Sequence, residues 1–193
     1  YSGTGNIALT YEEFVDGFID TNLKYVMFDR YPFIPDNGIC GRWFINMSII
    51  RKKADAANIP WWGFTQATGH YNGITLYCRM PTEGEFLWGM NTLLAYGAKG
   101  IGHFRLSFPP EWKNQADYST TGIFDPFGNK NVYWHYVKRG NNNLKAIDHC
   151  LMQSRHVGMI QHGKSPAPIP EYDQLGESWR ELVSVTGDPA AIG

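Results

Sequence analysis

Asp29 is the carboxylate of this chain that is best placed for chemistry. It follows the apolar run "KYVMF" and precedes Arg30 and Tyr31. In parallel α/β folds, ligands bind at the carboxyl ends of the strands, so an acid at such an end is a candidate general base or hydrogen-bond acceptor. An ion pair with Arg30 or Arg79 at the rim of the fold is the alternative. Tyr31 could donate a hydrogen bond to that carboxylate, or it could pack beside Pro32.

Two further apolar runs also end in polar residues. The run "IPWWGFTQATGH" has Thr65 and Gln66 at its end and His70 in the loop that follows. Gln66 can donate and accept hydrogen bonds at once, which suits a ligand with hydroxyl groups as well as a loop backbone. In "KGIGHFRL", His103 and Arg105 are two positions apart, so we expect them to share one face of a strand. They would line a cleft or form an ionic interaction at the rim with the acid of the first run.

The spacing of these runs indicates a parallel sheet. The expected strands begin near Lys24, Pro60 and Lys99, roughly 35–40 residues apart, as in successive βα units. The runs are short and almost continuously apolar, which is typical of strands covered on both faces. No phosphate-binding loop of the GxGxxG or GxxxxGK[ST] type follows them. The pattern predicts an α/β fold and favours part of a (β/α)8 barrel over a nucleotide-binding sheet.

Amphipathic segments separate the expected strands. Helices are expected over residues 10–22, 42–58, 81–100 and 132–152, and a small hairpin over 122–131. Capping-box patterns, Thr10 with Glu13 and Thr82 with Glu85, indicate where two of these helices begin. This role accounts for Glu85 without catalysis. We expect residues 1–164 to form one domain, with a strand near 156–163, and the Pro-rich residues 165–193 to be a linker or the start of a following segment.

The composition argues against several classes of protein. Of the 193 residues, 43% are hydrophobic and 18% are charged, which is the composition of a globular protein. The net charge of −1 and the scattered basic residues argue against nucleic-acid binding. No apolar run approaches the ~20 residues of a membrane span. Three separated cysteines and six histidines without ligand spacing predict neither a disulfide framework nor a metal site.

Four stretches together resemble a known family. They are "FDRYPF", "IPWWGFTQATGH", "PTEGEFLWGMNTLLAYGAKGI" and "FDPFGNKN". In order and spacing they look like the C-terminal part of the barrel of beta-galactosidase-like (family 42-like) glycoside hydrolases, which are common in gut Bacteroidetes. That pattern has a "YDHYPF" strand, an "IPFW…Q" strand, a "PTE.E.RWQ…LAYGAKGI" helix and an aromatic last strand. Each motif alone is weak, but four in register are fairly specific, and they span most of residues 1–165.

The resemblance implies an α/β fold that is the C-terminal portion of a (β/α)8 TIM barrel, with strands six, seven and eight at Lys24–Tyr31, Pro60–Gln66 and Lys99–Leu106. It implies an acid/base glutamate at the end of strand four, which would precede Tyr1. The nucleophilic glutamate of the larger clan stands at the end of strand seven, where this chain has Thr65 and Gln66. The chain also departs from the pattern at Arg30, which replaces a histidine, and in the last strand, which reads "HFRLSF".

The resemblance therefore predicts a glycosidase that needs no cofactor. Its substrate would be a carbohydrate, and its location secreted or periplasmic. With Asp29 as the catalytic candidate, the expected substrate contacts are Tyr31, Gln66, His70, Trp62, His103 and Arg105. Glycoside hydrolysis usually needs two carboxyl groups, about 5–5.5 Å apart for retention or 6.5–9.5 Å for inversion. The alternative is a non-hydrolytic carbohydrate-binding barrel that has lost its nucleophile.

Overall fold

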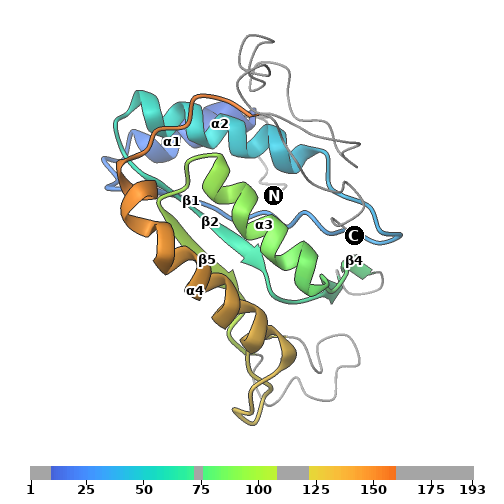
Figure 1. Ribbon diagram of the computed structural model, residues 1–193. Coiled ribbons are helices and arrows are strands. Elements are labelled where there is room, and N and C mark those ends of the chain that lie inside the picture. Colours follow the sequence, from blue (N-terminus) through green and yellow to red (C-terminus); the bar gives the residue numbers. More distant parts are fainter. Residues whose placement is uncertain (1–9, 72–75, 108–121, 160–193) are drawn as a thin grey trace.

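The computed structural model describes residues 10–71, 76–107 and 122–159, and of residues 70, 71, 76 and 77 the backbone alone. These segments contain four helices and five strands, and Figure 1 shows how they are arranged. In chain order they are α1 (Tyr11–Ile19), β1 (Val26–Phe28), α2 (Arg42–Ala56), β2 (Trp61–Gln66), β3 (His70–Tyr71), β4 (Leu76–Cys78), α3 (Glu83–Ala95), β5 (Gly100–Phe104) and α4 (Val132–Gln153). The predicted α/β fold is confirmed at this level.

The three predicted strands form one parallel sheet in the order β1-β2-β5. Val26 of β1 lies opposite Trp61 of β2, and Trp62 of β2 lies opposite Gly100 of β5. The strand order in space thus follows the order in the chain. Because the strands are parallel, their carboxyl ends meet at one edge of the sheet. Asp29, Gln66 and Phe104 are at or directly after these ends.

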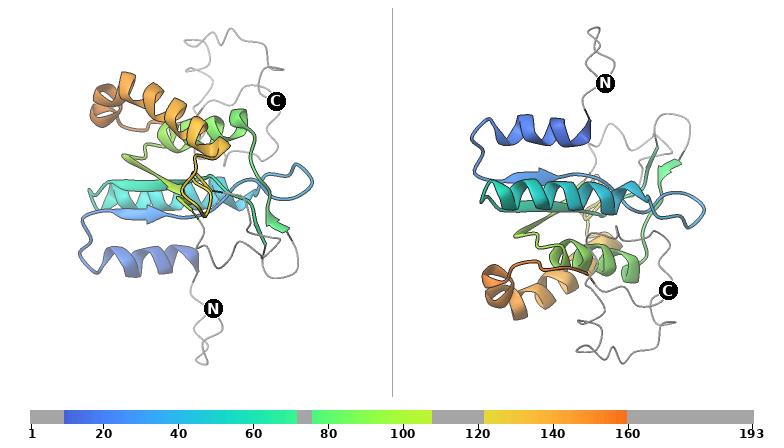
Figure 2. Two further views of the ribbon diagram at one scale, coloured as in Figure 1. Left: turned by 90° about the horizontal axis from the view of Figure 1, so that it is seen from below. Right: turned by 90° about the horizontal axis from the view of Figure 1, so that it is seen from above.

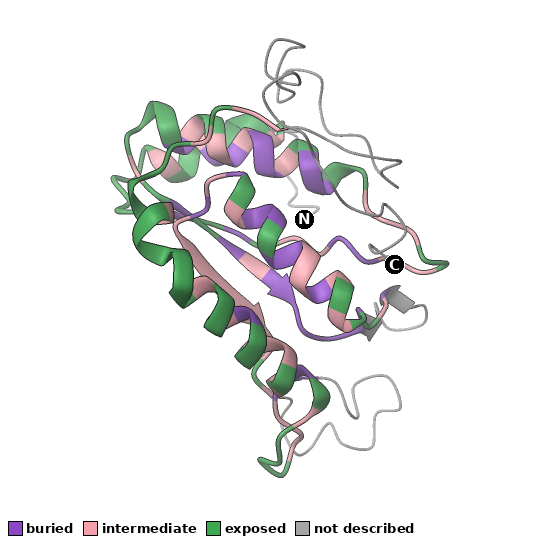
Figure 3. Cartoon of the chain, viewed as in Figure 1, coloured by how far each residue is buried: buried purple, intermediate pink, exposed green. Residues whose placement is uncertain are grey.

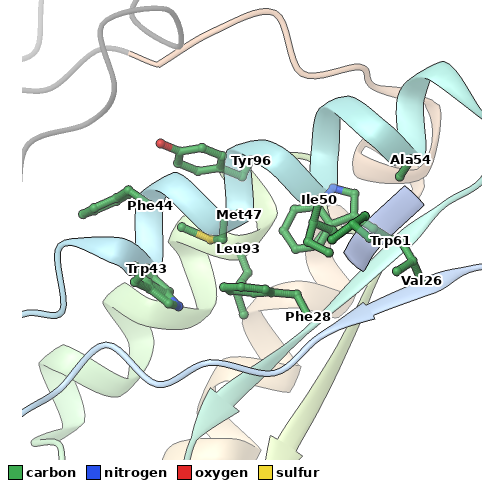
Figure 4. Close-up of a cluster of buried hydrophobic side chains, with 12 residues drawn as sticks. Val26, Phe28, Trp43, Phe44, Met47, Ile50, Ala54, Trp61, Leu93 and Tyr96 are labelled. Carbon is green, nitrogen blue, oxygen red and sulfur yellow. The ribbon is translucent and has the colours of Figure 1, made fainter. Parts of the chain in front are cut away.

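One face of the sheet packs against the helices. Val26, Phe28 and Trp61 belong to a buried cluster with apolar residues of α2, which Figure 4 shows together. At Gly63 the sheet lies so close to α3 that an added Cβ would come within 2.6 Å of the Leu93 side chain. The helices follow one another across the molecule in chain order (Figure 2). The residues that contact α2 and α3, Val26 and Phe28 in β1 and Trp61 and Gly63 in β2, are two positions apart in each strand. They therefore lie on the same face of the sheet.

The opposite face of the sheet carries the remaining side chains. Met27 and Trp62 are 42% and 38% exposed, and the Trp62 ring stacks on Tyr25 with 4.9 Å between centroids. Gly100 lies opposite Trp62, where any side chain would collide with the indole ring, and Gly102 lies opposite Phe64. Large residues of β2 thus face glycines of β5. None of the described helices covers this face.

The helix starts agree with their sequence signals. Thr10 and Thr82 accept hydrogen bonds from the backbone of Glu13 and Glu85, whose side chains reach back to the cap residues. Both predicted capping boxes are therefore confirmed. Helix α4 packs on α3 through Phe86, Tyr133 and their neighbours, and most of its other residues are exposed (Figure 3).

Some features differ from the sequence expectations. The short antiparallel pair β3–β4 lies in a segment that we expected to be a loop. The hairpin near residues 122–131 is present as a bridge between Phe124 and Lys130. The expected strand at 156–163 is described only to Met159, and the proposed linker 165–193 lies outside the described residues. Within the described segments, no helix combines the length and apolar character required to cross a bilayer.

Candidate functional site

Asp29 and Tyr31 form the centre of the candidate site. Asp29 directly follows β1 and is exposed, whereas Tyr31 is half-buried. The pKa of Tyr31 is raised far above its ordinary value, first by burial and then by the neighbouring Asp29 carboxylate. The phenol is therefore protonated at neutral pH and lies near a carboxylate that solvent can reach.

Phe104 and Arg105 bring the end of β5 to the same place. The rings of Tyr31 and Phe104 are 5.3 Å apart between centroids. The Arg105 guanidinium lies 5.4 Å from the Phe104 ring centre, and its charge acts to lower the pKa of Tyr31. Arg105 Nε also donates to the Ser107 carbonyl at 3.1 Å. Phe104 was not among the residues expected at the site, although its position in the last apolar run was a signal for it.

Gln66 has a structural role in place of the expected sugar contact. Its side chain is buried, with 1% of the residue exposed. Its Oε1 accepts from the Phe33 N–H at 3.0 Å, and its Nε2 faces the carbonyl oxygens of Phe33, Thr68 and Arg79 at 3.3, 3.2 and 2.5 Å. The amide is thus fully engaged by backbone, and we do not count Gln66 among the groups available to a ligand.

Thr65 and His103 lie on the helix side of the sheet. Thr65 Oγ1 is 2.6 Å from His103 Nδ1, and His103 Nε2 is 3.3 Å from Asn141 Oδ1 of α4. The imidazole also packs against the Phe86 ring of α3. Burial lowers the pKa of His103, and the Asn141 contact opposes this shift. The imidazole of His103 thus faces the helices, whereas the guanidinium of Arg105 lies over the Phe104 ring. The two residues were expected to share one face of a strand. Arg105 follows the last residue of β5, where the alternation of a strand no longer applies.

Trp62 does not join the cluster around Asp29. Trp62 is the second residue of β2 and lies four positions before Gln66, so it is about 13 Å from the carboxyl edge. It stacks on Tyr25 instead. His70 belongs to β3, where its backbone pairs with Cys78, and its side chain lies outside the described part of the structure.

The surrounding loops are held by a second group of polar contacts. Arg79 donates to both carboxylate oxygens of Glu85, which keeps the pKa of Glu85 at about 2. Arg30 Nη2 donates to Cys40 Sγ at 3.3 Å, so the expected pairing of Asp29 with Arg30 or Arg79 is replaced by other partners. Burial raises the pKa of Cys78 to about 12, which keeps this thiol protonated. Arg79 and Glu85 thus tie this loop to the start of α3.

Comparisons of the chain with protein-family models, with curated proteins and with solved structures found no match.

Four residues at the carboxyl edge of the sheet could contact a ligand: Asp29, Tyr31, Phe104 and Arg105. Asp29 is able to accept a hydroxyl hydrogen bond or a proton, and the protonated phenol of Tyr31 lies near that carboxylate. Arg105 adds positive charge beside Tyr31, and Phe104 supplies an apolar wall. Among the described residues at the end of β2, Thr65 and Gln66 add no acid. The cluster thus provides one carboxylate.

Proposed function

We propose that this chain is the C-terminal portion of a glycoside hydrolase-like (β/α)8 barrel, with Asp29 in the site that acts on glycosidic bonds. The observation that carries the proposal is the gathering of Asp29, Tyr31 and the Phe104–Arg105 pair at the carboxyl ends of parallel strands. Ligands of barrels and other parallel α/β folds bind at this edge. In the proposed reaction, Asp29 acts as a base or orients a sugar hydroxyl, and Tyr31 positions it.

The arrangement of the sheet supports the barrel part of the proposal. Its strands stand in chain order, and its described contacts with α2 and α3 are all on one face. A doubly wound sheet instead reverses its strand order and carries helices on both faces. On the open face, Trp62 lies opposite Gly100 and Phe64 opposite Gly102. Large side chains facing glycines would suit the packed interior of a barrel, which side chains fill in layers.

Glycoside hydrolysis by this route needs a second carboxyl group. Because the described end of β2 carries Thr65 and Gln66, the partner of Asp29 would come from another barrel strand. The sequence resemblance places that acid in strand four. Carbohydrate is the substrate class, and the reaction requires no cofactor.

The decisive experiment uses the product of the intact gene. Turnover would be measured on a panel of aryl glycosides for the wild-type protein and for Asp29→Asn. The substitution keeps the shape but removes the charge and basicity of the side chain. We expect kcat/KM to fall at least about 30-fold, which corresponds to about 2 kcal/mol of transition-state stabilisation.

A matched control is Asp36→Asn, which makes the same chemical change at an exposed position of the loop after β1. Asp36 has a φ of 58°, a conformation that asparagine tolerates well. We expect the control to leave kcat/KM unchanged. Equal activities of wild type and Asp29→Asn would remove Asp29 from the site.

A non-hydrolytic carbohydrate-binding barrel is the second candidate. The engagement of both strand-end residues of β2 favours it, since Thr65 contacts His103 and Gln66 contacts backbone. In this case the intact protein would bind sugars saturably, as measured by calorimetry, and would hydrolyse none of the aryl glycosides. Turnover that disappears with Asp29→Asn would exclude this candidate.

A further inference from the structure

An apolar groove of about 510 Å3 lies between α1 and β1. Phe14 and Phe18 line it from α1, with their rings in edge-to-face contact and half of each residue exposed. Tyr25 and Met27 line it from the strand side, and each is 42% exposed. Four large apolar side chains exposed side by side are unusual for a free surface and mark an interaction site.

The floor of the groove is continuous with the core of the protein. Val15, Val26 and Ile50 line the groove, and all three also belong to the buried cluster beneath α2. Figure 4 shows Val26 and Ile50 within this cluster. A partner seated in the groove would therefore extend an existing hydrophobic core.

The backbone of β1 offers hydrogen bonds on the same side. The Val26 N–H donates to the Pro60 carbonyl at 3.1 Å, so Val26 faces β2. In a parallel ladder the next residue directs its N–H and C=O to the other side. Met27 therefore presents both groups to the groove, where none of the described strands pairs with β1. An edge of this kind is a template for a further strand.

The rest of the sheet shows what fills such a groove. Helix α2 covers β1 and β2 together, because Val26 of β1 and Trp61 of β2 share its buried cluster. Helix α3 covers β2 and β5 together, because Gly63 of β2 lies against this helix and His103 of β5 packs on its Phe86. In both cases the helix packs on the strand that precedes it in the chain and on the strand that follows it. Helix α1 is followed by β1, and the groove lies where a strand preceding α1 would pack in the same series.

We propose that the groove between α1 and β1 binds a parallel β-strand with apolar side chains, supplied by polypeptide that precedes α1. Phe14 and Phe18 would then meet the helix that leads into this strand. The docked strand would pair with Met27 and bury the groove residues. The proposal concerns the assembly of the sheet: it rests on the barrel part of the proposed function but not on the proposed reaction.

Other occupants fit less well. Copies of the chain joined from β5 of one to β1 of the next would bring together six or nine strands, whereas barrels of this class close with eight. Residues 165–193 contain Pro166, Pro168 and Pro170, and proline cannot donate to a ladder. Both remain distinguishable outcomes of the test.

The test is amide hydrogen exchange at single-residue resolution. The 193-residue chain would be compared with the product of the intact gene. We expect the Met27 amide to exchange rapidly in the 193-residue chain and at least about 100-fold more slowly in the intact protein. The Val26 amide, which already bonds to Pro60, is the internal reference and should be protected in both.

Two variants of the intact protein sharpen the result. Phe18→Asp places a charge in the groove and should accelerate exchange at Met27. Phe127→Asp makes the same change at a turn residue that is 71% exposed and should leave Met27 unaffected. Equal exchange at Met27 in the 193-residue chain and the intact protein would overturn the proposal, as would an intact gene that encodes no strand before α1.

The other occupants would give different results in the 193-residue chain. Protection of Met27 that rises with protein concentration would identify a second copy as the occupant and overturn the proposal. Protection that vanishes on removal of residues 165–193 would do the same in favour of the chain's own C-terminal segment. A protein that protects Met27 but hydrolyses no glycoside would refute only the proposed function.

Discussion

Asp29 and Gln66 lie at neighbouring strand ends but differ in what they can offer a ligand. The Asp29 side chain is exposed beside Tyr31, so its carboxylate oxygens have acceptor positions for a substrate. The hydrogen-bonding groups of the Gln66 amide are satisfied by the backbone of Phe33, Thr68 and Arg79. Residue type and a position at a strand end made both of them candidates, and only the surroundings separate them.

His103 leads to a prediction about pH. Its pKa is lowered by burial, so the unfolded chain, with a pKa of about 6.5, binds more protons than the folded chain at mildly acidic pH. The free energy of unfolding should therefore fall as the pH drops below about 6.5 toward the folded pKa. Urea denaturation at pH 7.5 and pH 5 would measure this change.

The variant His103→Gln should reduce this pH dependence. His135→Gln, at an exposed position on α4, is the matched control and should leave it as in the wild type. If wild type and His103→Gln lose the same stability between the two pH values, His103 does not contribute to the acid sensitivity.

Strand positions were predicted from the sequence more reliably than strand faces. The apolar runs located β1, β2 and β5 to within a few residues, because a buried parallel strand requires a short apolar segment. The same uniformity conceals which alternate residues face the helices. His103 therefore appeared beside Arg105 on a cleft, whereas it contacts Phe86 and Asn141. The Gln66 contacts join segments far apart in sequence, which no local pattern indicates.

At the level of elements, α1 and α3 begin with the same capping box but in different surroundings. In α3 the box glutamate, Glu85, also receives two hydrogen bonds from Arg79, and it is partly buried. In α1 the box glutamate, Glu13, is exposed and has Thr10 as its hydrogen-bond partner. Helix α3 is thus tied at its start to the loop after β4.

The two boxes predict different effects of the same substitution. Glu85→Gln should lower the free energy of unfolding by about 1–2 kcal/mol, because it weakens charge-assisted hydrogen bonds. Since the pKa of Glu85 is about 2, its stabilisation is present above about pH 4.5 and is lost as the pH falls toward 2. Denaturant unfolding between pH 7 and pH 3 would measure both effects.

Glu13→Gln is the matched control at the corresponding position of α1. It should have a smaller effect, because no arginine contacts Glu13 among the interactions of the described residues. Equal losses in the two variants would show that Arg79 adds nothing to the α3 cap.

At the scale of the whole molecule, one buried amide connects three parts of the chain. Gln66 at the end of β2 binds Phe33 in the loop after β1 and Arg79 in the segment after β4. Gln66→Met keeps a similar volume and removes the amide, which leaves the Phe33 N–H without this partner. We expect a loss of at least about 2 kcal/mol in the free energy of unfolding, measured by urea denaturation.

Gln153→Met makes the same change at the exposed end of α4 and should be nearly neutral. Similar midpoints for the wild type and the Gln66→Met variant would contradict the structural role of the amide. The loops at the carboxyl edge would then be held by other contacts.

The surroundings of Gln66 also bear on how this lineage can change. One base substitution turns a glutamine codon into a glutamate codon, so an acid at the end of β2 is a single mutational step away. That step would set a carboxylate oxygen where Nε2 now faces the carbonyls of Phe33, Thr68 and Arg79. The new acid would be desolvated and surrounded by acceptors, which favours its protonated form. Descendants can gain an ionised acid there only after the neighbouring loops have diverged, so the order of substitutions is constrained by epistasis.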